Sequence, residues 1–148
     1  MPVIFREAEE ADLPAVVALL ADDQLGAARE TGTPGAYLAA FRQMARDGYN
    51  RLIVGESGGR IVAVYQLTLI PGISLAATTR AQIEGVRVAA GQRGQGTGAA
   101  LLADAEARAR AAGAGLLQLT MNRSRADAHR FYEANGFTPS HVGFKKPL

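Results

Sequence analysis

Residues 81–102 read AQIEGVRVAAGQRGQGTGAALL, which predicts an apolar strand, a glycine-rich turn and the start of a helix. Glycines at positions 94, 96 and 98 leave few Cβ atoms in the turn and permit positive φ. Successive backbone N–H groups can then point into one concavity at the positive end of the helix. With the fixed charge of Arg93, the turn predicts a site for a phosphate-bearing ligand. A tight turn with glycines for close packing is the alternative.

The composition indicates a globular protein with a single domain over residues 1–148. Of its 148 residues, 48% are hydrophobic and 20% are charged, which is typical of this class. The net charge of +2 is too small to indicate a nucleic-acid partner. The sequence lacks cysteine and has only His129 and His141, so we expect no metal site. It shows neither a signal peptide nor a membrane-spanning run, and we expect a cytoplasmic protein.

Apolar periodicity along the chain predicts a mixed α/β fold. Asp12 is the expected N-cap of a first helix, and Thr33-Pro34 starts a second that Gly48 ends. Strand 60–70 is apolar on both faces and should be central in the sheet. The segment 22–32 is predicted to be a loop or a broken helix, and the segment 73–79 is predicted to be a loop. The predicted strands are 2–7, 51–56, 60–70, 80–88, 115–121 and 141–148, and the predicted helices are 13–20, 34–47, 98–112 and one from 124 or 125 to 135.

Two other phosphate-binding motifs fit the glycine turn less well. Gly94 to Ala99 matches G-x-G-x-x-A, but a dinucleotide fold also needs an acidic residue about 20 residues on. Here the next strand ends in Thr120-Met121-Asn122, without a carboxylate. A Walker P-loop needs a lysine after the glycines, and the sequence has none there.

Two motifs instead resemble those of the GNAT N-acetyltransferase superfamily. The acyl-CoA-binding pattern Q/R-x-x-G-x-G/A is met by Arg93, Gly96 and Gly98, and Tyr132 to Phe137 contains Y-x-x-x-G-F. The resemblance implies a single-domain GNAT-like fold, with a central mixed, twisted sheet of six to seven strands flanked by four helices. The runs 127–132 and 140–144 also look similar to aminoalkylphosphonate N-acetyltransferases, but that likeness is local.

The resemblance implies direct acetyl transfer from acetyl-CoA to a primary amine of a small molecule or peptide. Many family members place an asparagine where this chain has Arg125, and we expect Asn122 to take that contact. Val86 and Val88 would pair by backbone with the pantetheine amides. The expected cofactor-binding residues are Val86, Arg87, Val88, Arg93, Gly94, Gln95, Gly96, Thr97, Gly98, Asn122 and Arg125.

The reaction needs a base and an acid. An amine with a pKa of ~10.4 costs ~4.6 kcal/mol to deprotonate at pH 7. Glu84 is the expected base, since strand alternation places it on the same side as Val86; a solvent-facing glutamate is the alternative. Tyr132 occupies the family's acid position and would donate a hydrogen bond to the leaving sulfur. A core tyrosine beside Phe131 is the alternative.

A non-catalytic acyl-CoA-binding sensor or regulatory module of the same fold stays open as a second function. Residues 22–33 and 71–80 are expected to wall the acceptor pocket, with Arg80 as a possible contact for a carboxylate or phosphonate. Arg123, Arg125 and Arg130 hold an anion on one interpretation and form a solvated face on the other. We expect neither a nucleic acid nor a membrane as partner, and the final strand could pair across a homodimer.

Overall fold

The computed structural model describes residues 1–148, apart from the side chain of Gln24. Five strands form one sheet in the order β1-β2-β3-β4-β5, with only the β4–β5 pair parallel. None of the helices in the described part of the chain is long and apolar enough to cross a membrane. The strands are β1 (Ile4–Glu7), β2 (Asn50–Ser57), β3 (Arg60–Ile70), β4 (Arg80–Val88) and β5 (Leu116–Leu119). The helices are α1 (Leu13–Leu20), α2 (Gln24–Arg29), α3 (Pro34–Asp47), α4 (Ser74–Ala77), α5 (Thr97–Ala111) and α6 (Ala126–Ala134), with 3-10 turns η1 (Glu10–Asp12) and η2 (Ala90–Gln92).

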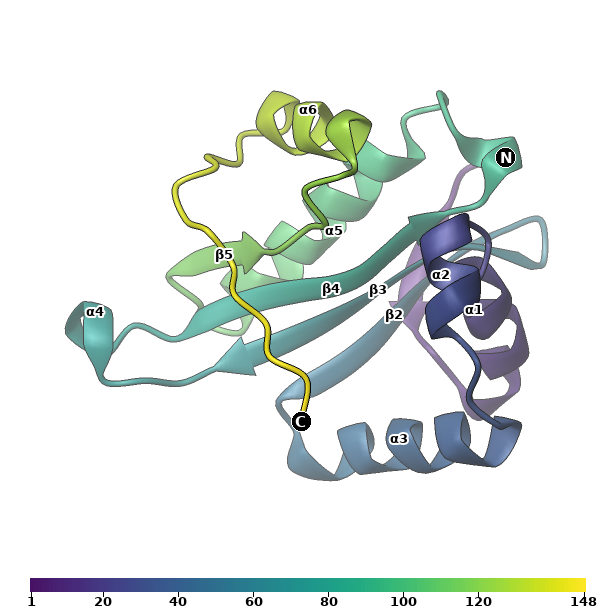
Figure 1. Ribbon diagram of the computed structural model, residues 1–148, viewed down its shortest axis with the longest axis horizontal. Helices are drawn as coiled ribbons and strands as arrows, with labels where there is room; N and C mark the ends of the chain where they lie inside the picture. Colours follow the sequence, from purple (N-terminus) through teal and green to yellow (C-terminus); the bar gives the residue numbers. More distant parts are fainter.

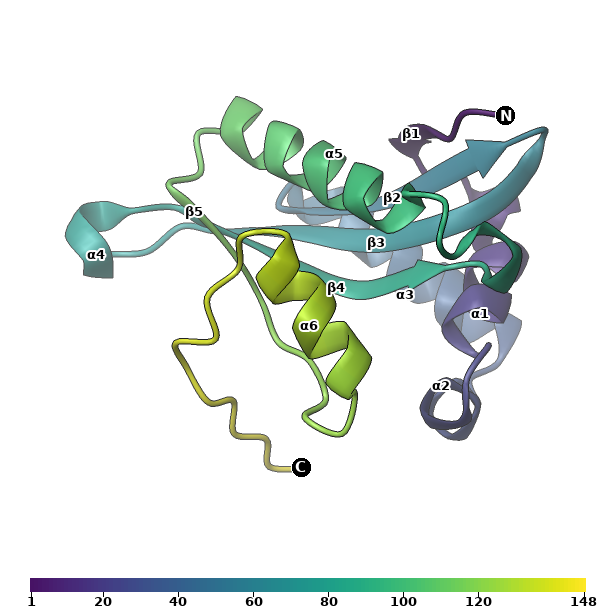
Figure 2. The ribbon, with the colours of Figure 1, turned by 90° about the horizontal axis from the view of Figure 1, so that it is seen from above.

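The sheet separates two layers of helices. Figure 2 shows α5 on one side and α1, α2 and α3 on the other. On the α5 side, Leu101 packs with Tyr65 and Ile83 in the larger buried cluster. On the α1 side, Val16 and Leu19 pack against Val54 and Val64. Strand β3 contributes to both clusters, which confirms its predicted central place.

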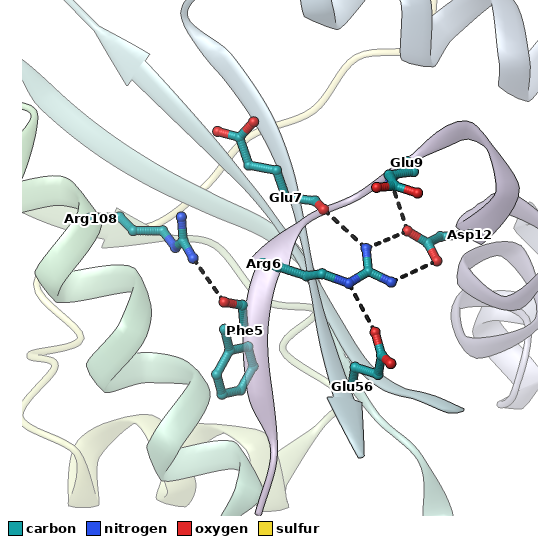
Figure 3. Close-up of polar contacts among 7 residues, drawn as sticks. All are labelled: Phe5, Arg6, Glu7, Glu9, Asp12, Glu56 and Arg108. Carbon is teal, nitrogen blue, oxygen red and sulfur yellow. Dashed lines mark hydrogen bonds and ion pairs between the residues drawn. The ribbon is translucent and has the colours of Figure 1, made fainter. Parts of the chain in front are cut away.

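A buried polar network fixes α5 on the sheet. The hydroxyl of Tyr65 donates to Asp104 Oδ2 at 2.5 Å, and Arg108 Nε donates to the same oxygen at 2.8 Å. Burial and the neighbouring carboxylate raise the pKa of Tyr65, so its hydroxyl stays a donor. Arg108 Nη2 reaches the carbonyl oxygen of Phe5 at 3.2 Å (Figure 3). The second half of α5 is thereby tied to β3 and β1.

Helix α2 forms inside the segment for which the sequence left a loop and a broken helix open. Its N-cap is Asp23, whose Oδ1 accepts a hydrogen bond from Gly26 N at 2.5 Å. The short helix agrees with the second alternative, and the six residues Gln24–Arg29 are too few for a clear helical period in the sequence. The Thr33 cap is confirmed, because its Oγ1 accepts from Ala36 N at 3.2 Å.

The sheet has five strands instead of six to seven, because the described residues 138–148 are not strand. This C-terminal segment crosses the molecule on the side of α1 and α3 (Figure 1), with Val142 79% and Phe144 93% exposed. Pro139 and Pro147 lack the N–H that a strand donates. The predicted closing strand at 141–148 is therefore wrong.

Arg6 joins β1 to β2 and to the turn before α1 (Figure 3). Its Nε donates to Glu56 Oε2 at 2.9 Å, and its Nη1 and Nη2 donate to the two carboxylate oxygens of Asp12 at 2.8 and 3.1 Å. Asp12 also accepts from Glu9 N at 2.8 Å, so its side chain does not cap α1 as predicted. These hydrogen bonds hold the pKa of Asp12 below its ordinary value.

We expect Arg6→Met to lower the free energy of unfolding by about 1–2 kcal/mol at pH 7, because it leaves the largely buried Asp12 without its bidentate partner. Since the pKa of Asp12 is lowered in the folded state, this stabilisation is present above the unfolded pKa of ~3.9 and is lost as pH falls through the folded pKa. Urea unfolding at pH 7 and at about pH 3 measures both effects.

Arg42→Met is the matched control, because Arg42 and Glu10 form an ion pair with side chains 56% and 51% exposed. It should lower the free energy of unfolding less than Arg6→Met does, because an ion pair between exposed side chains is screened by solvent. Equal losses for the two variants, or a loss for Arg6→Met that persists undiminished at low pH, would contradict the role assigned to Arg6.

Candidate active site

A β-bulge in β4 sets the geometry of the site. In the β3–β4 register Gln66 faces Glu84, but Val64 faces Arg87, so Gly85 and Val86 share one partner position. Gly85 has a φ of +60°, which glycine adopts without the strain that a Cβ would add. The extra residue reverses the alternation of side chains along the rest of the strand.

The bulge corrects one prediction about Glu84. Val86 and Val88 pack against the buried cluster on the α5 side, whereas Glu84 is exposed and accepts from Gln82 Nε2 at 2.5 Å on the other side. Glu84 therefore does not share a face with Val86, as simple alternation predicts. Arg87, opposite Val64, lies on the α1 side together with Glu84.

Strands β4 and β5 pair over only part of their length. Arg80–Ile83 pair with Leu116–Leu119, and beyond this point the strands separate (Figure 1). In the described structure the β5-facing edge of residues 84–88 is outside this pairing. An extended ligand with amide groups can add to such an edge as a strand would, which suits the predicted backbone contacts of Val86 and Val88.

The glycine turn forms an open concavity at the start of α5. Gly96 is the N-cap with a φ of +81°, and the first helical hydrogen bond runs from Ala100 N to Gly96 O at 3.0 Å. The amides of residues 97–99 thus precede the helix's own hydrogen bonds. Within the described protein, a Cβ added at Gly94 or Gly96 would meet no atom within 4 Å. The turn therefore fits a bound phosphate group.

Other residues of the turn have distinct roles. Arg93 is exposed at the rim of the turn. Gln95 Nε2 stabilises the turn by donating a hydrogen bond to Gly91 O at 2.9 Å. Thr97 is buried, with Oγ1 3.4 Å from Gln92 Oε1. A Cβ at Gly98 would lie 3.0 Å from Phe131 Cζ, so this glycine permits α5 and α6 to pack closely. Its amide still lies in the first turn of α5.

Tyr132 lies on α6, which packs against α5, the helix that follows the glycine turn. Its ring packs against Phe131 at a centroid distance of 5.3 Å and against Phe137 at 5.8 Å. Burial raises the pKa of Tyr132, and the positive charges of Arg87 and Arg125 offset part of that effect. The phenol is therefore protonated at neutral pH and available as a hydrogen-bond donor. The two arginines act on it electrostatically, which places all three groups in one region.

The loop between β5 and α6 contains the other predicted contacts. Asn122 is exposed, and its Oδ1 accepts from Ser124 N at 3.0 Å and from Ser124 Oγ at 2.6 Å, which shapes the loop. Arg125 precedes α6, and its Nη2 lies 2.7 Å from Asp23 Oδ2. His129 pairs with Glu133 at 2.6 Å on an exposed flank of α6.

A row of polar side chains, not predicted from the sequence, runs across the α1 side of the sheet. Thr68 Oγ1 donates to Asn50 Oδ1 at 2.7 Å, and Gln118 Nε2 donates to Gln82 Oε1 at 2.8 Å. Arg80, the expected anion contact, instead has Nη1 3.3 Å from Gln118 Oε1. The available signal was Gln66 and Thr68, two polar residues in an otherwise apolar central strand. The row surrounds Glu84 with hydrogen-bonding groups suited to a polar ligand.

Comparison with known proteins agrees with this geometry. The sequence model of the Acetyltransferase (GNAT) family matches residues 14–137. A Bacillus halodurans C-125 protein, called a transcriptional regulator, is 43% identical with a TM-score of 0.95, covering 99% of this chain and 100% of its own. A putative acetyltransferase from Agrobacterium tumefaciens str. C58 is 26% identical with a TM-score of 0.85, covering 98% and 99%.

Glucosamine-6-phosphate N-acetyltransferase from Arabidopsis thaliana shares the fold, with 17% identity, a TM-score of 0.80 and coverage of 100% and 99%. No curated protein matches the chain.

We expect Gly96→Val to abolish binding of coenzyme A in isothermal titration, because the valine side chain would project into the open concavity. The positive φ should also cost about 1–2 kcal/mol in stability. Gly48→Val is the matched control, since Gly48 has a φ of +73° with no atom of the described protein near its Cβ position. The control should lose similar stability and keep its affinity; unchanged affinity in Gly96→Val would refute the phosphate site.

Proposed function

The chain belongs to the GNAT family of acetyltransferases, and we propose that it transfers an acetyl group directly from acetyl-CoA to a primary amine of a small molecule or peptide. The observation that supports this most is the bulge at Gly85. It puts a carboxylate on one face of β4 beside a strand edge that can hold an extended acyl carrier. The concavity at the start of α5 follows the same strand.

The residues present fit coenzyme A. The amides of residues 97–99 and the open space over Gly94 and Gly96 suit its diphosphate, and exposed Arg93 adds a charge at the rim. The β4 edge at Val86 and Val88 suits its pantetheine amides. When bound, acetyl-CoA would supply an acetyl group activated as a thioester.

Glu84 is proposed as the base that makes the amine nucleophilic. Its exposed carboxylate, directly or through a water, accepts a proton from the ammonium nitrogen, which at pH 7 costs ~4.6 kcal/mol for a lysine-like amine. The neutral nitrogen then forms the bond to the acetyl carbon as the carbon–sulfur bond breaks, and the second proton that the nitrogen loses as the amide forms passes to solvent. The polar row around Glu84 would orient the acceptor.

Tyr132 is proposed as the acid for the leaving sulfur. Its raised pKa keeps the phenol protonated, so it can give its proton to the thiolate and regain one from solvent. The aromatic contacts with Phe131 and Phe137 hold the ring, so its core packing and its catalytic role are compatible.

A second candidate is an acyl-CoA-binding regulatory module without turnover. The 43% identity to a protein called a transcriptional regulator favours it. The exposed carboxylate of Glu84 favours the enzyme, since a sensor that only binds its ligand has no use for a base.

Free-thiol release from acetyl-CoA in the presence of an amine panel tests the proposal. We expect amine-dependent turnover, lowered ~10²-fold or more by Tyr132→Phe with the affinity for coenzyme A retained. Tight coenzyme A binding without turnover of any amine would support the regulatory module. Turnover unaffected by Tyr132→Phe would show that Tyr132 is not the acid and only packs in the core.

Glu84→Gln should move the rising limb of the pH–rate profile to higher pH, because the amine must then lose its proton to solvent before it binds productively. The control is Glu106→Gln, which removes an exposed carboxylate on α5 far from the site. Gln82→Glu would not be a suitable control, because it adds a second carboxylate beside Glu84. Superimposable profiles for Glu84→Gln and the native protein would remove Glu84 as the base.

A further inference from the structure

Three charged residues from distant parts of the chain meet on the α1 side of the sheet. Asp23 starts α2, Arg87 follows the bulge in β4, and Arg125 precedes α6. Asp23 Oδ2 lies 2.7 Å from Arg125 Nη2 and 3.9 Å from Arg87 Nε. One carboxylate is thus shared between two guanidinium groups, and its other oxygen is occupied by the N-cap hydrogen bond to Gly26.

The cluster carries an excess of positive charge in a mostly buried place. The side chains of Arg87 and Arg125 are only 18% and 26% exposed. Burial and the neighbouring charge of Arg125 lower the pKa of Arg87, and Arg29 adds to this repulsion. With one carboxylate shared between the guanidinium groups of Arg87 and Arg125, the cluster has an excess of one positive charge and attracts anions.

Two donors of this cluster are incompletely satisfied. Within the described structure, Arg87 Nε and Arg125 Nη2 are buried and lack a hydrogen bond of good geometry, although Arg125 Nη2 is close to Asp23. Arg87 Nη1 donates to Val86 O at 2.9 Å, whereas the buried Nε has only the carboxylate of Asp23 nearby, at 3.9 Å, beyond hydrogen-bond distance. Buried charged donors without an acceptor are costly, so a ligand that supplies one is favoured there.

We propose that Arg87 and Arg125 bind an anionic group, a carboxylate or a phosphonate-type group, on the amine acceptor. This proposal rests on the proposed acetyltransferase function and specifies its substrate class. Glu84 and Arg87 lie on the same side of β4 at the two ends of the bulge, three positions apart. At ~3.3 Å per residue their Cα atoms are roughly 7–10 Å apart, which suits a short amine with an acidic end.

The cluster is separate from the diphosphate site. Helix α5, whose first turn forms the glycine concavity, packs on the opposite side of the sheet from α1 (Figure 2), and Arg87, which pairs with Val64, lies on the α1 side. Asp23 also comes from residues 22–33, one of the segments predicted to wall the acceptor pocket. An anion at Arg87 and Arg125 would therefore lie on the acceptor's side of the strand.

The test uses anion binding, which does not depend on turnover. The arginine Nε–H signals of the coenzyme A-saturated protein are followed by NMR during titration with propanoate, methylphosphonate and neutral propanamide. We expect saturable shifts of the Arg87 signal with one or both anions and none with propanamide. A preference between the two anions identifies the type of acidic group. Arg87→Met and Arg125→Met should each lower the affinity for the anion at least about tenfold.

Controls separate the possible failures. Arg110→Met removes an exposed arginine paired with Glu106 on α5 and should leave anion affinity unchanged. If Arg87→Met lowers folding stability, Arg87→Lys keeps the charge and should retain part of the anion affinity. Loss of coenzyme A affinity equal to the loss of anion affinity would assign the arginines to the cosubstrate and overturn the proposal.

Matched acceptors complete the test. We expect kcat/KM for 3-aminopropanoate or 2-aminoethylphosphonate to exceed that for the neutral 3-aminopropanamide at least about tenfold, and Arg87→Met to remove this preference. Acetylation of the amide as fast as the acids, without anion binding, would overturn the substrate class and leave the acetyltransferase intact. Anion binding without acetylation of any amine would instead count against the proposed function.

Discussion

The extra residue at Gly85 is the constraint on which the site depends. Without it, period-2 alternation would put Glu84 and Val86 on one face and Arg87 on the other. With it, the charged side chains of Glu84 and Arg87 share the α1 side, while Val86 and Val88 stay in the core under α5. A single glycine at positive φ thus gives a strand whose last part is apolar on one face and charged on the other.

This arrangement requires that the neighbouring elements do not move. The Tyr65–Asp104–Arg108 network is largely buried, where hydrogen bonds to charged groups are stronger than in water. It ties α5 to β3 and, through Phe5, to β1. Because the glycine turn leads directly into α5, the same network fixes the amides at the start of the helix relative to the bulge.

The sequence predicted features whose causes are local. The Thr33 cap, the glycine turn and the central β3 all follow from residues within a few positions of one another. The bulge has a local sign, an isolated glycine within a strand, but its effect on side-chain direction needs the register with β3. The cluster of Asp23, Arg87 and Arg125 joins three elements far apart in sequence, so no local pattern reveals it.

The C-terminal segment also shows that local sequence alone does not determine whether a strand forms. Residues 141–148 have a strand-like composition, yet pairing depends on a partner edge, and β5 is only four residues long. Residues 138–148 therefore cross the sheet without pairing with it (Figure 1).

The charge balance on that side explains why the protein retains an unfavourable cluster. A second carboxylate beside Arg87 would neutralise the arginines and remove the desolvation cost, but it would also occupy the donors that an anionic ligand needs. Binding sites commonly retain such destabilised groups, because optimising them for stability removes their affinity. Asp23 neutralises only part of this charge. Its Oδ2 holds Arg125 in place, and its Oδ1 accepts the N-cap hydrogen bond from Gly26 N. The cluster is therefore ordered before a ligand arrives and still lacks one negative charge, which an acidic acceptor would bring.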